Sequence, residues 1–320
     1  MMLRTVLILG GSGFVGRALL AKLVRAQPGL RLRVPSRRPA RTKALAMLPG
    51  VELIEADVHD PATLARLVQG CDAVVNLVAI LHGSAARFEA VHVQLPQRLV
   101  EACRAAATPH LLHVSALGVP DDPAQAPSLY LRSKARGEAV LRAGGVPLTL
   151  LRPSVIYGAE DRFINLFAAL QAVMPVMALA GAQARFQPVW VEDVAQALLQ
   201  CLQAAPPAAP QTFEAAGPKV WTLAQIVRAA GVWSGHPRRI VPLPEAIGRL
   251  QAGLLGLLPG EPLMSADNLD SMRLPNVASG RLPGLAELGI RPSALESVMP
   301  ELLRRGPQPL DLLRALARRD

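Results

Sequence analysis

The chain has 320 residues, of which 51% are apolar and 3% aromatic, and its formal net charge is +10. This length and apolar content are enough for a sizeable core, which excludes a disordered chain and allows one large domain or two interlocked ones. The basic residues are dispersed, and aromatic side chains that could stack on bases are few. We therefore expect no nucleic-acid partner.

An apolar run followed directly by clustered glycines begins the chain. Residues 4 to 9 predict a strand, and an apolar helical pattern starts within the glycine cluster. Glycines let the backbone approach a pyrophosphate, and the N-terminus of the following helix offers N–H groups to it. The strand before and the helix after are the context that this motif requires. The sequence predicts a dinucleotide site at Gly10, Gly11, Ser12, Gly13, Phe14, Val15 and Gly16.

The residues after the second predicted strand, 30 to 34, indicate which dinucleotide binds. An NAD site would carry Asp or Glu roughly 20 residues beyond the glycines to hold the ribose 2′-OH. This chain has Ser36, Arg37 and Arg38 there instead. A guanidinium is a forked, permanently charged partner for a 2′-phosphate. We therefore expect NADP(H) rather than NAD(H).

Strand-like runs alternate with helical stretches through the first half of the chain. Further strands are predicted at 51–54, 72–78, 110–115 and 146–152, with a returning strand at 212–216. This alternation predicts an α/β fold, a Rossmann doubly wound parallel sheet with a smaller, mostly helical C-terminal substrate domain. We expect the nucleotide-binding domain at 1–157, its sheet completed by 186–217, and the smaller region at 158–185 and 218–320.

Cysteine use and apolar segments bear on the compartment. The cysteines, at positions 71, 103 and 201, are odd in number and widely spaced, which fits a reducing compartment. No signal peptide is expected before the first strand. Residues 166–182 and 246–259 are apolar but too short or interrupted to span a bilayer. Each could line an apolar cleft, or one could rest on a membrane. We expect a cytoplasmic protein, with peripheral contact at the inner face of the membrane as an alternative.

Three polar residues in the middle of the chain have the chemistry of proton transfer. Ser115 ends a predicted strand, and Tyr130 and Lys134 lie four residues apart on the next predicted helix, so they share a face. A neighbouring ammonium would lower the pKa of the phenol, and a serine hydroxyl can hold a substrate oxygen. The histidines at 82, 92, 110 and 113 lack ligand spacing, so no metal site is expected.

The glycine turn, Ser115 and Tyr130-x-x-x-Lys134 in this order resemble the extended short-chain dehydrogenase/reductase superfamily. The resemblance implies further cofactor contacts at Asp57 and Val58, at Leu77, Val78 and Ala79, and at Pro153, Ser154 and Val155. Within this superfamily the chain is similar to the atypical branch that includes the nucleotide-binding accessory subunit of respiratory complex I. The segments 130–138, 258–268 and 274–277 carry that second resemblance.

The resemblance implies an NADP(H)-binding oxidoreductase in which Tyr130 exchanges a proton, Lys134 lowers its pKa and holds the ribose, and Ser115 orients the oxygen. The expected substrate is a small apolar carbonyl, alcohol or quinone-like molecule. An alternative is a cofactor-stabilised accessory or assembly protein without turnover, bound to a respiratory or quinone-pathway membrane complex. A third is a nucleotide-sugar epimerase or dehydratase, for which Arg185, Arg238 and Arg239 could bind the diphosphate.

Overall fold

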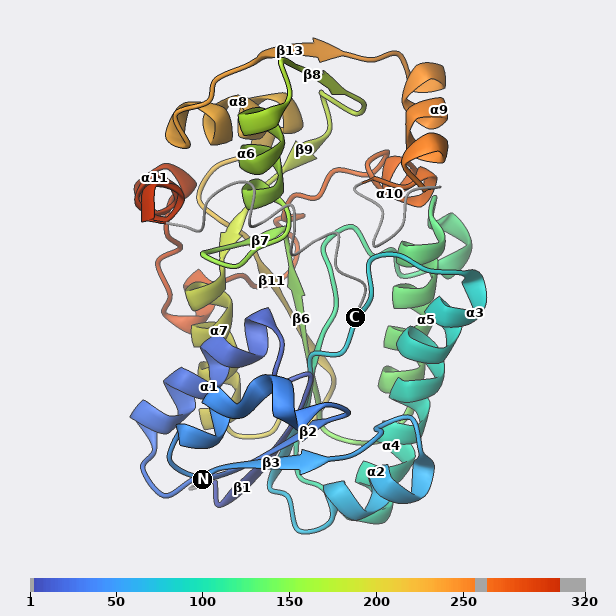
Figure 1. Ribbon diagram of the computed structural model, residues 1–320. Helices are drawn as coiled ribbons and strands as arrows, with labels where there is room; N and C mark the ends of the chain where they lie inside the picture. The colour runs from blue at the N-terminus through green and yellow to red at the C-terminus, as the bar shows by residue number, and fades with distance from the viewer. Residues whose placement is uncertain (1–2, 257–263, 306–320) are drawn as a thin grey trace.

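A seven-stranded parallel sheet forms the centre of the molecule in the computed structural model, which describes residues 3–256 and 264–305 (Figure 1). Its strand order is β11-β6-β5-β4-β1-β2-β3. The order reverses between β1 and β4, where open α/β sheets bind ligands. The predicted doubly wound sheet is confirmed. The strands are β1 (Thr5–Leu9), β2 (Arg31–Ser36), β3 (Val51–Glu55), β4 (Ala73–Asn76), β5 (Leu111–Val114), β6 (Leu148–Pro153) and β11 (Gln211–Ala215).

Helices cover both faces of this sheet, which explains why its central strands β1 and β4 are buried along their whole length. One core lies beneath α1 (Phe14–Ala26) and α7 (Val191–Gln203). The opposite core lies beneath α2 (Pro61–Val68), α4 (Leu95–Ala105) and α5 (Leu129–Ala143). A short helix, α3 (Ala85–Glu89), and a π-helical turn, Ala90–Gln94, lead into α4.

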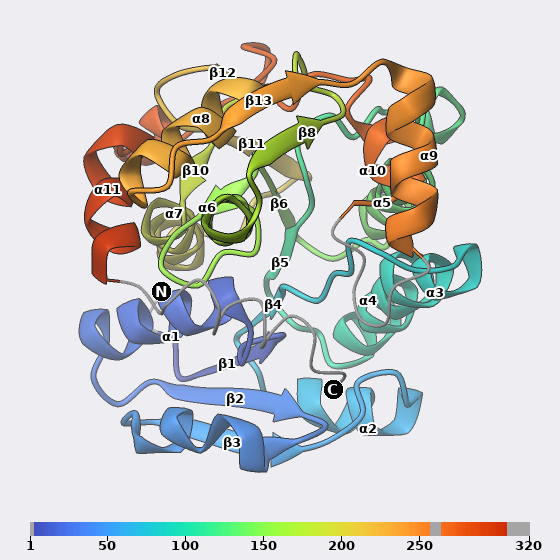
Figure 2. The same ribbon diagram turned by 45° about the horizontal axis from the view of Figure 1, so that its top comes forward.

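Most segments after β6, apart from α7 and β11, build a second lobe above the carboxyl ends of the strands (Figures 1 and 2). Its core packs beneath α6 (Ile164–Val173), α8 (Leu223–Trp233) and α11 (Leu295–Arg305). This part of the molecule also contains three strand pairs that were not among the predicted strands. They are β7 (Ile156–Tyr157) with β10 (Val189–Trp190), β9 (Arg185–Phe186) with β12 (Trp221–Thr222), and β8 (Val176–Leu179) with β13 (Arg239–Pro242).

Two further helices connect the lobes: α9 (Glu245–Gly256) and α10 (Ala266–Ser271). Figure 1 shows α10 between α9 and α5. An ion pair of 2.5 Å joins Arg249 on α9 to Asp270 on α10. Within the described ranges, no helix is long and apolar enough to cross a membrane. The stretch 257–263, part of the segment that resembles the complex I branch, lies outside the described residues, as do 306–320.

A buried ion pair fixes α5 against the sheet. Arg152 on β6 donates to both carboxylate oxygens of Glu138, at 2.9 and 2.6 Å, and both side chains are more than nine-tenths buried. Removing one partner of such a pair leaves the other charge buried without compensation. The pair therefore makes the attachment of α5 to β6 sensitive to a single substitution.

We expect Glu138→Ala to lower the free energy of unfolding by about 3–5 kcal/mol, because Arg152 would stay buried with only the longer, 3.7 Å pair to the exposed Asp121. Glu89→Ala removes the more exposed bidentate pair with Arg136 and is expected to cost less than about 1 kcal/mol. Urea unfolding of both variants measures the difference. Equal losses would show that the buried pair does not hold α5.

Candidate functional site

The turn between β1 and α1 requires glycine at two positions. Gly10 has φ +75°, and a Cβ placed on it would lie 3.1 Å from the carbonyl carbon of Leu77. A Cβ on Gly16 would lie 2.5 Å from the backbone of Gly10 and Gly11. The main chain after β1, the first turn of α1 and the segment after β4 are therefore in close contact, as a dinucleotide turn requires.

The N-terminus of α1 is suited to an anion. Its N-cap is Gly13, which offers no side-chain cap, and the first turn has no acidic residue. Helix N-termini leave N–H groups without helical partners, and their dipole favours negative charge. Phe14 lies against Gly158 from the second lobe, and Arg17 pairs with Glu160 beside it. The glycine turn thus faces the junction of the two lobes.

The residues expected to recognise the adenosine end lie at the ends of β2 and β3. Arg37 and Arg38 are exposed, and neither forms an ion pair with another residue in the described part of the chain. The register places Glu55 beside Ser36, so a carboxylate does lie near this strand end, contrary to the expectation. Asp57 is exposed, and its carboxylate accepts the N–H of His59 at 3.0 Å. The half-buried Val58 packs against the core beneath α2.

Two buried polar side chains hold the segment Leu77–Ala79 after β4. Asn76 accepts the Val78 N–H at 3.1 Å and donates to His113 Nδ1 at 3.0 Å. His92 Nε2 accepts the Ile80 N–H at 3.2 Å. The Nδ1 of His92 therefore carries the proton and donates it in a hydrogen bond to Ser133 Oγ at 2.8 Å. Asn76 and His92 are structural anchors of this segment that the sequence analysis did not assign.

Lys134 is buried at the end of β5. Its Nζ donates to the Val114 carbonyl at 3.1 Å, one residue before Ser115. Burial lowers the pKa of Lys134 to about 8, against the effect of the nearby Glu138. Burial and the nearby ammonium lower the pKa of His92 to about 2, so the imidazole is neutral. At the end of β5, Lys134 is thus a buried positive charge close to the neutral imidazole of His92.

The Ser115 hydroxyl is buried and has no hydrogen-bond partner among the described residues. A buried unsatisfied hydroxyl normally costs stability, so each case calls for an explanation. The hydroxyl of Ser115 is thus a polar group at the end of β5 that is free to form a further hydrogen bond.

Tyr130 lies in the first turn of α5, one helical turn before Lys134. Its ring packs edge-on against His92, with 5.6 Å between ring centroids, and against Phe88 at 6.2 Å. Burial raises the pKa of Tyr130 to about 12. This corrects the expectation that Lys134 lowers it, because desolvation of the phenolate dominates. The phenol is therefore protonated at neutral pH.

The loop after β6 is tied to the C-terminal part of the chain. Asn276 Oδ1 accepts from Ser154 Oγ at 2.7 Å and from the Val155 N–H at 3.0 Å, and its Nδ2 donates to the Leu117 carbonyl at 3.2 Å. Pro153 is the last residue of β6, and its carbonyl accepts the Leu117 N–H. The asparagine lies in segment 274–277, which the sequence analysis quoted without assigning it a role.

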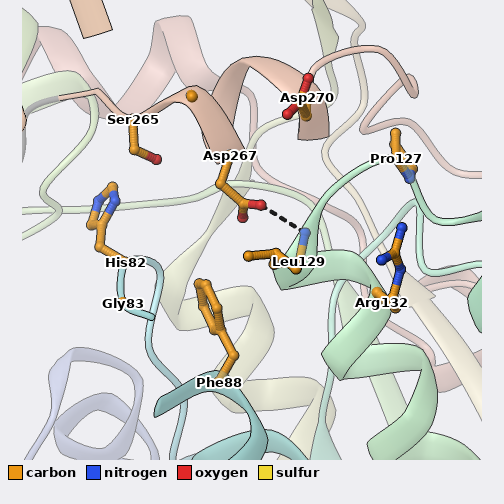
Figure 3. A pocket seen from close by; sticks show the side chains of 10 residues that line it. His82, Gly83, Phe88, Pro127, Leu129, Arg132, Ser265, Asp267 and Asp270 are labelled. Carbon is orange, nitrogen blue, oxygen red and sulfur yellow. Dashed lines mark hydrogen bonds between the residues drawn. The ribbon is translucent and has the colours of Figure 1, made fainter. Parts of the chain in front are cut away.

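A pocket of about 490 Å³ lies between α3, α5 and α10 (Figure 3). Phe88 and Leu129 point toward its centre, and Asp267 reaches from α10 to the Leu129 N–H. Its walls are His82, Gly83, Phe88, Pro127, Leu129, Arg132, Ser265, Ala266, Asp267 and Asp270. The lining is mixed apolar and polar, and Tyr130 is not part of it, although its ring packs against Phe88, which is.

Comparison with known proteins agrees with this geometry. The NAD(P)H-binding family matches residues 10–205. The chain is 30% identical over 305 residues to "NADH dehydrogenase [ubiquinone] 1 alpha subcomplex subunit 9, mitochondrial" from Mus musculus, which covers 93% of this chain and 79% of the mouse protein. It is 32% identical over 254 residues to the ceramide reductase of Caulobacter vibrioides, covering 78% of this chain and 76% of that protein.

Solved structures share the fold. An NADPH-dependent quinone oxidoreductase from Escherichia coli, complexed with NADPH, superposes with a TM-score of 0.73 at 23% identity, covering 92% of this chain and 98% of that one. The family match, the mitochondrial relatives and the shared fold agree with the glycine turn and the parallel sheet. The chain therefore belongs to the NAD(P)H-binding family, as an extended short-chain dehydrogenase/reductase-like protein related to the complex I subunit.

Proposed function

We propose that the protein is an NADP(H)-dependent reductase of a small apolar carbonyl or quinone-like substrate. The observation that carries this proposal is a protonated Tyr130 one helical turn from a buried Lys134, on a helix whose first turn lines the pocket through Leu129. A chain of contacts links them to the glycine turn: Gly10 touches Leu77, Ile80 binds His92, and His92 packs on Tyr130.

The residues have distinct roles in this proposal. The glycine turn and the α1 N-terminus hold the diphosphate, Lys134 holds the ribose hydroxyls, and Arg37 and Arg38 bind the 2′-phosphate. The bound nicotinamide supplies the hydride. Tyr130 donates the proton to the substrate oxygen, since the phenol carries its proton at neutral pH. Ser115 donates a hydrogen bond to that oxygen.

The pocket lining favours an apolar substrate with one polar end. Phe88, Leu129 and Pro127 supply apolar walls, and Leu81, which precedes His82 in the chain, is 58% exposed. The arginines that would bind a nucleoside diphosphate, Arg185, Arg238 and Arg239, do not line this pocket. The lining therefore favours a carbonyl or quinone-like molecule over a nucleotide sugar.

We expect Arg37→Ala/Arg38→Ala to weaken NADPH binding by about tenfold or more and to leave NADH binding nearly unchanged, because charge-assisted bonds to the 2′-phosphate are lost. Isothermal titration with both nucleotides measures this. The control is Arg31→Ala/Arg104→Ala, which also removes two positive charges, from exposed positions at the start of β2 and the end of α4. An equal loss for NADH and NADPH would contradict a role in cofactor choice.

We expect Tyr130→Phe to lower kcat by about 10²-fold or more, since general acid catalysis contributes on that order, while nucleotide affinity stays unchanged. The assay follows NADPH oxidation with a panel of apolar ketones and aldehydes and a short-chain ubiquinone. Full turnover by Tyr130→Phe with any of these acceptors would contradict the proposed proton donor.

A second candidate function is an accessory subunit that retains its cofactor without turnover. The mouse relative is named as a subunit of NADH dehydrogenase, and the second lobe presents an unusual surface. Residues 173–176, Val-Met-Pro-Val, are consecutively exposed, and Val176 pairs with the exposed Arg239 across β8 and β13. The sequence has no Asp or Glu in 162–191 or 215–244. Such a run of exposed apolar residues is unusual unless it is functional.

If this face, defined by residues 173–176 and 239–241, binds membrane-embedded respiratory complex I, the protein should co-purify with complex I subunits from detergent-solubilised native membranes. We expect Met174→Ser/Val176→Ser to abolish that recovery, because the apolar contact is lost. Leu282→Ser, at an exposed leucine outside this face, should not. Recovery of no complex I subunit with the unaltered protein would contradict the accessory role.

A further inference from the structure

The short helix α10 caps the helix that carries Tyr130. Asp267 accepts the N–H of Leu129 at 2.6 Å through one carboxylate oxygen and the N–H of Tyr130 at 3.1 Å through the other. Ser128, the N-cap residue of α5, accepts the next N–H, from Leu131, at 3.1 Å. An N-cap side chain alone satisfies one such group. Here three successive N–H groups are bound by side chains.

Both main-chain polar groups of Tyr130 are held by side chains from its surroundings. Its N–H binds Asp267, and its carbonyl accepts the Ser133 hydroxyl at 2.8 Å. Ser133 in turn is hydrogen-bonded to His92. The carboxylate also lies at the positive end of the α5 dipole, where negative charge is favourable. The first turn of α5 is thereby fixed at the residue where a helix end otherwise frays.

Asp267 itself is held from two directions. A capping box between Ser265 and Asn268 fixes the start of α10, and Ser271 donates to Ser128 at 2.8 Å. On the other side, Leu269 packs against Ala180 of the second lobe. The residues of α10 and its N-cap that make these contacts lie beyond 10–205, the range that the NAD(P)H-binding family matches. The segment outside that range therefore determines the position of the tyrosine inside it.

We propose that Asp267 is a positioning residue for Tyr130, which couples the wall of the substrate pocket to the geometry of proton transfer. This rests on the proposed reductase function. Asp267 lines the same pocket (Figure 3), so a substrate there contacts the segment that holds the tyrosine. A displacement of about 1 Å in a reacting group can cost about 10²-fold in rate. Loss of the carboxylate should therefore lower kcat and leave nucleotide binding intact.

The test is Asp267→Asn, which keeps the shape of the side chain but removes its charge and one acceptor. Thr222→Ala is the matched control, because Thr222 caps α8 in the second lobe through Gln225. Amide hydrogen exchange of the full-length protein without ligand reports on α5 independently of activity. We expect exchange at Leu129 and Tyr130 to rise by about tenfold or more in Asp267→Asn, since bonds to charged acceptors are the stronger ones, and to stay unchanged in Thr222→Ala.

Turnover of NADPH with the ketone, aldehyde and ubiquinone panel is the second readout. We expect kcat to fall by about tenfold or more in Asp267→Asn, with the Kd for NADPH unchanged, and neither to change in Thr222→Ala. Unchanged exchange at Leu129 and Tyr130 would overturn the proposal, as would faster exchange with an unchanged kcat while Tyr130→Phe is inactive. If Tyr130→Phe is fully active, the reductase function fails instead, and the exchange data alone decide whether Asp267 holds Tyr130.

Discussion

The arrangement of the site depends on a buried polar stripe along one face of α5. Tyr130, Lys134 and Glu138 follow one another at four-residue spacing, and each is removed from water to a large extent. Buried polar groups must find partners, so this face of the helix accepts very few positions on the sheet. The Val114 carbonyl takes the ammonium and Arg152 takes the carboxylate. Those two contacts place Tyr130 at the ends of β4 and β5.

The same requirement organises the neighbouring segments. The segment after β4 is held by Asn76 and His92, the loop after β6 by Asn276, and the first turn of α5 by Asp267. None of these residues carries a reacting group in the proposed chemistry. They replace solvent with fixed protein partners, which is how a site gains a defined geometry before its ligands arrive. The unpartnered Ser115 hydroxyl is the exception, and it lies beside the contact of Lys134.

The sheet was predictable from the sequence because its central strands, such as β1 and β4, are buried on both faces and their apolar runs are continuous. All seven predicted strands are present, and the glycine turn lies between β1 and α1 as the spacing indicates. The strands of the second lobe, two to four residues long, are too short to produce a periodic pattern. The pairing of Asp267 with α5 joins residues 137 positions apart, and no local pattern encodes it. The predicted shift in the pKa of Tyr130 was wrong in direction, because the four-residue spacing reveals the neighbouring charge of Lys134 but not how far the phenol is buried.

The central claim is that the glycine turn and the buried Lys134 form a dinucleotide site. The most direct measurement is mass spectrometry of the nucleotide released when the purified protein is denatured, followed by titration of the stripped protein with NADPH and NADH. We expect NADP(H) to be released, or NADPH to bind more tightly than NADH. Affinity for neither nucleotide would contradict the dinucleotide site and, with it, the reductase function.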